Sequence, residues 1–300
     1  MSTAISLGDY AKTNIREGIR QRSDNLIVVI PGQRLNLDND DIRGSGIIDI
    51  NGVPVSTVCG VLNKVNKLVK VNPYGGVYNG EVGDVVVGRV VEVQQRRWKL
   101  DISSRQEALL NFTNFQLPGV KNQRRSLNDE LALQSLLVRG DLISGEIHSI
   151  YSDGTILLQT RSSKYGKLGK GVLVKVPFYL VTRSKTHLFK HEKGVSFVFG
   201  CNGNIWVYPC DPKNSDLAIG WSSDPHNKVP RDLMLDTIRF ANCVRILATY
   251  HLDINDWTVS KAYEFSQIHD LKDISLPPVI HDVAVKVLEE MKKNGMFKDR

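Results

Sequence analysis

Four consecutive residues, Arg96-Arg97-Trp98-Lys99, combine positive charge with a large flat ring. Cationic side chains attract phosphate and aromatic rings stack on bases, so this string offers both components that a single-stranded nucleic acid requires. Trp98 also alternates with Leu100 and Ile102, as residues on one face of a strand do. The indole is therefore either a base-stacking ring or a core anchor, and in the second case the charges belong to a solvated turn.

Positive charge is concentrated in two windows of the chain. Residues 89–125 contain eight basic and three acidic residues, and residues 161–193 contain nine basic and one acidic. The windows carry +5 and +8, so the rest of the chain carries −6 against a total of +7. If the windows meet in space, their surface attracts a polyanion such as RNA. The alternatives are a solubilising face and contact with an acidic protein.

Two further groups of cations are candidate RNA contacts. Lys121, Arg124 and Arg125 precede a helix predicted from Leu127, which Ser126 caps, so they can contact phosphate near a helix N-terminus or contact a neighbouring subunit. The second group stands where two modules join, where interdomain ion pairing competes with RNA binding. It comprises Arg161, Lys164 and Lys167.

Gly200-Cys201-Asn202-Gly203 has the Gly-x-x-Gly spelling of a KH loop, which clamps the backbone of a nucleic acid. A KH loop joins two helices, whereas the segments on either side, 197–199 and 205–207, have the composition of strands. The two central residues carry no charge. We therefore predict that Gly200, Asn202 and Gly203 form a structural turn that packs one module on another.

The sequence gives little support to an enzyme. His187 and His191 have a spacing that could join two metal ligands on a helix, but Lys185, Lys190 and Lys193 surround them and repel a cation. Asp84 and Asp141 are better explained as turn residues than as a nuclease pair, since no third carboxylate accompanies them. There is no Walker loop, Gly-x-Ser-x-Gly or dinucleotide fingerprint. We predict no catalytic residue, no metal and no cofactor.

Composition and the positions of turn-forming residues predict a mainly β protein with an α+β C-terminal part. Residues 1–25 form a polar tail, and residues 26–78 an N-terminal β domain with a hairpin at Asn51-Gly52. Residues 79–162 read as five short strands of an OB-type barrel. Residues 163–300 contain further strands and then helices over about 230–250, 256–265 and 277–293, the last capped by Ser275.

An internal echo strengthens the prediction of a barrel. In residues 82–90 and 139–147, three residues separate a Gly-Asp pair, Gly83-Asp84 or Gly140-Asp141, from a second glycine. Gly-Asp gives a tight entry into a strand, and the later glycine permits the bend at a barrel corner. A tandem duplication is the weaker alternative, because the segments that follow differ.

The composition of the chain excludes several classes of protein. A hydrophobic content of 41% and a charged content of 24% allow a buried core, which argues against general disorder. No uncharged apolar run approaches the roughly 18 residues that span a bilayer, and the first residues do not resemble a secretory signal. Four dispersed cysteines without a Cys-x-x-Cys pair favour reduced thiols inside a cell and argue against a zinc knuckle.

Several strings in fixed order resemble one family, and they span about residues 26–270. The strings are RGSG (43–46), KVNKL (64–68), GEVGDVVVGRVVEVQQRRWK (80–99), RRSLNDELAL (124–133), TRSSKYGKL (160–168) and GCNGNIWVYP (200–209). Together they resemble the S1/KH cap subunits of the RNA exosome. TRSSKYGKL followed by GCNGNIWVYP is the most specific part of the match.

The resemblance implies an N-terminal β domain, an S1-type OB barrel and a KH-like domain. It also implies a non-catalytic subunit that sits with neighbouring cap subunits on a ring of RNase PH-like proteins and helps thread single-stranded RNA toward a nuclease. Eukaryotic relatives act in nucleus, nucleolus and cytoplasm, with no membrane partner. Independent of the resemblance, a stand-alone RNA-binding factor, for example one associated with the ribosome, and a metal-dependent nuclease remain the alternatives.

Overall fold

The computed structural model describes residues 27–38, 40–115, 134–160, 164–210 and 228–294. The chain divides into two compact units. The first contains Met1–Gly76 with the short segments Thr249–His251 and Leu288–Arg300, and the second contains Val77–Ala248 and Leu252–Val287. The predicted tail (1–25) and the start of the predicted helix at Leu127 lie outside the described residues, whereas residues 134–136 are helical.

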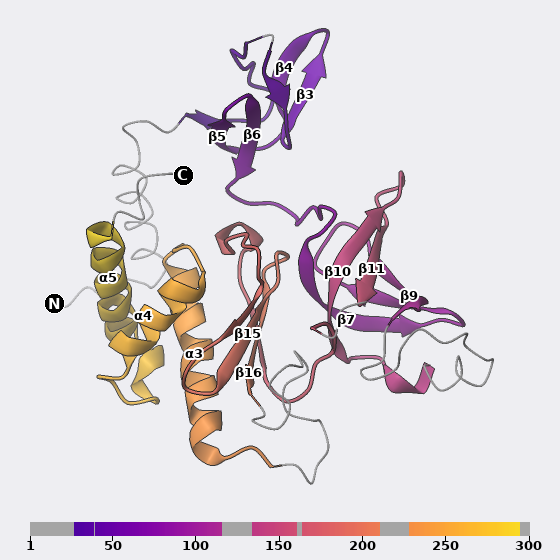
Figure 1. Cartoon of the computed structure of the whole chain (residues 1–300). Coiled ribbons are helices and arrows are strands. Elements are labelled where there is room, and N and C mark those ends of the chain that lie inside the picture. The colour runs from indigo at the N-terminus through magenta and orange to yellow at the C-terminus, as the bar shows by residue number, and fades with distance from the viewer. Residues whose placement is uncertain (1–26, 39, 116–133, 161–163, 211–227, 295–300) are drawn as a thin grey trace, which may run out of the picture. The chain divides into compact units, whose positions relative to one another are not determined.

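The first unit is built from short strands, as predicted (Figure 1). One sheet has the order β1-β5-β6-β2, and β3 and β4 form a separate hairpin. Asn51 and Gly52 connect that hairpin with φ of 53° and 78°, which confirms the turn that their spelling predicted. The strands are β1 (Val28–Val29), β2 (Ile42–Arg43), β3 (Ile47–Ile50), β4 (Val53–Ser56), β5 (Gly60–Val65) and β6 (Leu68–Pro73).

The second unit begins with a closed barrel of five strands, which confirms the predicted OB-type fold. Its sheet runs β11-β9-β8-β7-β10-β12, and β10 also pairs with β11 to close the barrel. β9 and β11 run parallel, and the neighbouring barrel strands run antiparallel. The strands are β7 (Val85–Val93), β8 (Arg97–Asp101), β9 (Ala108–Phe115), β10 (Leu142–Ile150), β11 (Ile156–Thr160) and the short β12 (Gly166–Lys167).

The echoed Gly-Asp segments face each other across the antiparallel pair β7 and β10. Gly83 N and Ile147 N donate to Ile147 O and Asp84 O, and Gly140 N and Val90 N donate in the same way to Val90 O and Asp141 O. Gly88 lies opposite Ile143 and Gly145 opposite Val86. The two segments are thus related by a local two-fold axis near the Val87–Ser144 pair. The repeated sequence pattern gives both strands the same turn at their start. The segments that follow the two strands need not resemble each other for this.

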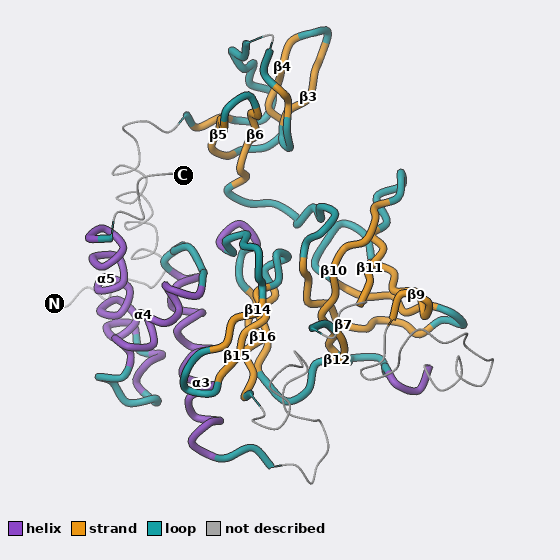
Figure 2. Tube along the Cα trace, viewed as in Figure 1, coloured by secondary structure: helices purple, strands orange, loops and turns teal. Residues whose placement is uncertain are grey.

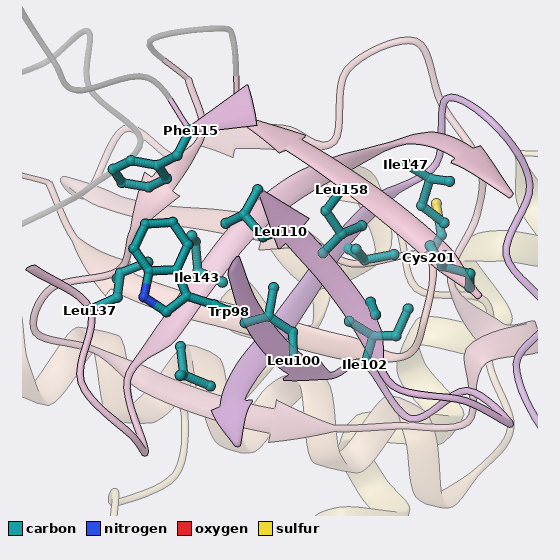
Figure 3. Close-up of a cluster of buried hydrophobic side chains, with 14 of the residues drawn as sticks. Trp98, Leu100, Ile102, Leu110, Phe115, Leu137, Ile143, Ile147, Leu158 and Cys201 are labelled. Atoms are coloured by element: carbon teal, nitrogen blue, oxygen red, sulfur yellow. The ribbon is translucent and has the colours of Figure 1, made fainter. Parts of the chain in front are cut away.

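Side chains from all five strands fill the barrel (Figure 3). Trp98, Leu100, Ile102 and Leu110 are fully buried there. The indole of Trp98 lies 4.3 Å from the Phe112 ring and 5.3 Å from the Phe115 ring between centroids. The alternation of 98, 100 and 102 therefore marks the inner face of β8.

A second sheet and three helices, apart from the C-terminal ends of two of them, complete this unit (Figure 2). The sheet has the order β13-β16-β15-β14, with β13 (Val172–Lys175), β14 (Leu188–Lys190), β15 (Val195–Phe199) and β16 (Asn204–Pro209). Two 3-10 turns, η1 (Phe178–Leu180) and η2 (Asp273–Ser275), lie between the larger elements. The helices are α3 (Arg231–Thr249), α4 (Asp256–Ser266) and α5 (Pro277–Lys293).

The helices follow the predicted ranges, with one correction. Phe240 of α3 packs between Phe197 of β15 and Tyr263 of α4, at centroid distances of 5.2 and 4.0 Å. Asn255 caps α4 through a capping box with Thr258. Ser275 does not cap α5 as predicted, because it ends η2, and Leu276 O accepts the hydrogen bond from Ile280 N instead.

Candidate nucleic-acid interface

The Gly200–Gly203 turn seals the barrel rather than projecting from the fold. β7 pairs with β8 only from Arg89 onward, so the backbone of Val85 and Val87 needs another partner. Cys201 N donates to Val85 O at 2.8 Å, and Asn202 Nδ2 donates to Val87 O at 2.9 Å. Val87 N donates to Asn202 Oδ1 at 3.3 Å. The Asn202 amide thereby replaces the peptide unit of a missing strand neighbour.

Further contacts make this seam specific. Asn202 Nδ2 also donates to Ile102 O at 2.8 Å, and Asn204 Nδ2 donates to Val87 O at 2.8 Å. Gly203 has a φ of 81°, and a Cβ there would stand 2.2 Å from Val176 O, so a larger residue does not fit. The turn is 4% exposed at Asn202 and lies between two strands, as the sequence predicted. The structural interpretation accounts for all of these contacts.

A buried carboxylate holds a second point of the same seam. Asp84 Oδ2 accepts from Tyr78 Oη at 2.7 Å, from Glu81 N at 3.1 Å and from Arg183 Nη2 at 3.1 Å. Arg183 also pairs with Glu81. Burial and the adjacent Asp84 charge raise the pKa of Tyr78, so its hydroxyl stays a donor. Asp84 is thus a turn and anchoring residue.

Two exposed cations, Arg96 and Arg97, lie at the β7–β8 turn. Gln94 N donates to Arg97 O at 2.9 Å, and Arg97 Nε donates to Gln94 Oε1 at 2.6 Å, which orients the guanidinium along the turn. Gln134 Nε2 donates to Gln95 O at 3.1 Å, which attaches the turn to the helical residues 134–136. An open depression of about 560 Å³ is lined by Gln94, Gln95, Arg96, Arg97, Asn111 and Thr113. Donors and cations of this kind suit phosphate and sugar.

Trp98 is not part of this surface, which corrects its candidacy as a base-stacking ring. The residue is 0% exposed and points into the barrel, so neither face of the indole can meet a base. The core interpretation that the alternation allowed is the right one. The charged neighbours Arg96 and Arg97 are exposed, because they stand in the turn and on the opposite face of β8.

Two predicted RNA contacts are engaged in ion pairs. Lys99 Nζ lies 3.1 Å from Glu92 and 3.7 Å from Glu107, and the Lys99 hydrogen bond lowers the pKa of Glu92. Lys167 Nζ lies 2.7 Å from Asp141 and donates to Leu136 O at 3.1 Å. Lys167 therefore supports the interdomain alternative, since it joins the β12 segment to the second Gly-Asp turn.

The remaining predicted contacts are placed only in part. Lys164 is exposed just before β12. Lys121, Arg124, Arg125 and Arg161 lie outside the described residues and stay predictions. In the described part of residues 89–125, the basic residues Arg89, Arg96, Arg97, Lys99 and Arg105 face the acidic residues Glu92, Asp101 and Glu107, a net charge of +2.

The described residues do not form the metal site that the spacing of two histidines allowed. His187 and His191 flank the strand β14 instead of sharing a helix, which corrects that geometry, and His187 Nδ1 lies 3.0 Å from Phe199 O. Within these residues no group of three or more His, Cys, Asp and Glu side chains could hold a metal ion. None of the described helices has the length and apolarity to cross a bilayer.

Comparison with known proteins agrees with this geometry. Residues 77–149 match the model of the RRP4 S1 domain, and residues 171–213 match a KH domain. The chain is 39% identical over 283 residues to exosome complex component RRP4 of Bos taurus, covering 94% of this chain and 95% of that protein. The chain belongs to the RRP4 family. The likeness to the RRP4 of Saccharomyces cerevisiae is 30% over 96% of this chain and 90% of that protein.

Three polar or aromatic residues of this RRP4 family member lie at the surface and were not predicted as contacts. Asn111 pairs with Arg97 across β8 and β9, and Thr113 follows on the same face, so both line the depression. Strand alternation around Phe112 is the signal that could have found them. Tyr151 is 50% exposed beside the Asp153-Gly154 turn. The signal for Tyr151 is an aromatic residue next to a polar turn.

Proposed function

We propose that this chain is a non-catalytic, RNA-binding cap subunit of the RNA exosome. It supports 3′-to-5′ RNA processing and degradation by guiding single-stranded RNA into the ring and by stabilising the assembly with neighbouring subunits. Its places of action are nucleus, nucleolus and cytoplasm. The observation that carries the proposal is the cationic, amide-lined β7–β8 turn on a closed barrel, in a chain that resembles RRP4 proteins over nearly its whole length.

The proposed division of labour follows three domains, at residues 26–78, 79–162 and 163–300. The barrel meets RNA through Arg96 and Arg97, which attract phosphate without selecting a sequence. The KH-like domain fixes the barrel through its buried turn and does not use that turn for RNA. The S1 match, residues 77–149, overlaps nearly all of its length with the second range, and the KH match, residues 171–213, falls inside the third, which supports the division.

The test is a pair of charge reversals in the assembled complex. Arg96→Glu with Arg97→Glu should shorten or abolish the protected RNA fragment and lower the salt dependence of binding by about 1.4 in log–log slope for two lost contacts. Lys190→Glu with Lys193→Glu is the matched control, because both lysines are exposed at the β14–β15 hairpin, outside the barrel strands. Equal protection by both variants and the unaltered chain would refute RNA guidance at this turn.

Two further measurements separate the alternatives. A stand-alone RNA-binding factor would run near the mass of one chain on gel filtration of cell extract, whereas a cap subunit runs with a large assembly. A metal-dependent nuclease would degrade RNA as purified protein with divalent cations and lose that activity on substitution of carboxylates. We expect the large assembly and no degradation.

A further inference from the structure

The barrel contains few rings that could stack on a base. Residues 77–160 include five aromatic residues, and four of them are buried: Tyr78, Trp98, Phe112 and Phe115 are at most 3% exposed. The fifth, Tyr151, is 50% exposed. Stacking requires an accessible π-face, so Tyr151 is the one aromatic residue of this stretch that can supply it.

The position of Tyr151 is fixed by its own hairpin. Tyr151 N donates to Thr155 O at 3.0 Å, and Gly154 N donates to Tyr151 O at 2.9 Å, which closes the β10–β11 turn. Asp153 Oδ1 accepts from Thr155 N and Oδ2 from Thr155 Oγ1, both at 2.9 Å. A backbone held this way loses little conformational freedom when a ligand binds its side chain.

A second loop of the barrel braces the hairpin from outside. Gln106 Nε2 donates to Asp153 O at 2.8 Å, and Thr155 Oγ1 lies 2.9 Å from Gln106 Oε1. Arg105, the residue before Gln106, is exposed, as is His148 on β10. The hairpin that carries Tyr151 thus contacts the loop that carries the exposed cation Arg105, and a ring and a cation are what single-stranded RNA uses.

The charge of Asp153 determines which part of RNA the β10–β11 turn can contact. The Thr155 backbone and hydroxyl hydrogen bonds lower the pKa of Asp153, so the carboxylate is ionised at neutral pH. A fixed negative charge repels phosphate, and the turn residues Ser152 and Gly154 are uncharged. A base, which is neutral and flat, is the fitting ligand, with the phosphate directed toward Arg105.

The geometry points to Tyr151 as a base-stacking contact for single-stranded RNA, separate from the phosphate-binding turn at Arg96 and Arg97. This inference rests on the proposed RNA-binding function. It assigns the two contributions to different loops: attraction to the β7–β8 turn and stacking to the β10–β11 turn. Stacking is tolerant of sequence, so the pair would hold RNA without choosing among targets.

The experiment measures binding of the full chain to a fluorescent RNA of roughly 12 nucleotides, within the site size of one OB fold. Tyr151→Ala should weaken binding about tenfold, at low and at physiological salt alike, whereas Tyr151→Phe should stay within about twofold of the unaltered protein. Tyr151→Leu keeps apolar bulk without a flat ring and should behave like the alanine variant. Tyr74→Ala, an exposed tyrosine outside the barrel, is the control.

The outcomes separate this inference from the proposed function. Unchanged affinity of Tyr151→Ala, or full affinity of Tyr151→Leu, while the unaltered chain binds RNA, would overturn the stacking contact and leave the proposed function standing. RNA binding that is absent from the unaltered chain and from the assembled complex would remove both. A melting temperature equal to that of the unaltered protein establishes that each variant is folded.

Discussion

The two Gly-Asp turns of the barrel share spelling and backbone, but they hold their neighbours differently. In both, the carboxylate accepts from the backbone N–H three residues earlier, at Glu81 and at Val138. The Asp84 side chain is 9% exposed and bound by Tyr78 and Arg183, while Asp141 is 27% exposed and paired with Lys167. The same motif thus forms a buried anchor at one end of the β7–β10 pair and a solvated ion pair at the other end.

The environment of these carboxylates, more than their shared motif, therefore sets how much each contributes to stability. A buried charge that loses its partner leaves an uncompensated group, whereas an exposed pair is screened by water. The local two-fold relates the backbones, and the KH-like domain breaks the symmetry because Arg183 covers only the Asp84 turn.

Asp84→Ala should produce the largest loss. It leaves the Tyr78 hydroxyl and one side of Arg183 without their acceptor, and we expect the free energy of unfolding to fall by about 3 kcal/mol. Asp141→Ala should lower it by less than about 1 kcal/mol. Urea titration of both variants checks the comparison, and equal losses would contradict it.

Asn202→Ala should follow, with a loss of about 2 kcal/mol. The substitution removes the amide that satisfies Val87 N and Ile102 O, and these backbone groups stay buried. Binding of RNA per folded molecule should not change. A variant that is fully stable but has lost RNA affinity would show that the turn is a KH loop after all.

Acidification should weaken the Asp84 end of the seam more than the Asp141 end. Burial lowers the pKa of His187, and also that of His191, below the ordinary 6.5. The folded chain then binds fewer protons than the unfolded chain, so stability falls as the pH drops through 6.5. Thermal unfolding between neutral pH and pH about 5 should show this slope, and His187→Gln should flatten it.

Lys167→Gln should have the smallest effect, at most about 1 kcal/mol, and high salt should diminish it further. The measurement is unfolding at low and high ionic strength. A loss as large as that of Asp84→Ala, or one that salt leaves unchanged, would mean that the two ends of the ladder are equivalent.

Local patterns predicted much of this fold. Asn51-Gly52 predicted its hairpin correctly because both residues adopt positive φ, and α3 begins at Arg231, next to the start of the predicted helix range. The short strands β12 and β14 were missed, since two or three residues carry no period of their own. His187 and His191 were spaced for a helix, yet sheet pairing with β15 placed them at the two ends of a strand.

The candidate site was harder to predict, because exposure depends on partners distant in sequence. Alternation put Trp98 on a face with Leu100 and Ile102, but only closure of the barrel by β10 and β11 made that face the interior. The acceptors of Lys99 are 7 and 8 residues away in sequence, at Glu92 and Glu107, and that of Lys167 is 26 away, at Asp141. Asn202 lies in a Gly-x-x-Gly pattern typical of a KH loop. Its structural role depends on the part of β7 that β8 does not pair with, which the sequence does not reveal.

Photo-crosslinking of 4-thiouridine RNA to the full chain within its assembly shows which residues contact RNA. The proposal is that the barrel meets RNA while the Gly200–Gly203 turn is structural. We predict crosslinked peptides that contain Arg96 and Arg97, with loss of the crosslinks in the double glutamate variant. Crosslinks confined to the peptide with residues 200–203, and none in the barrel, would contradict the account.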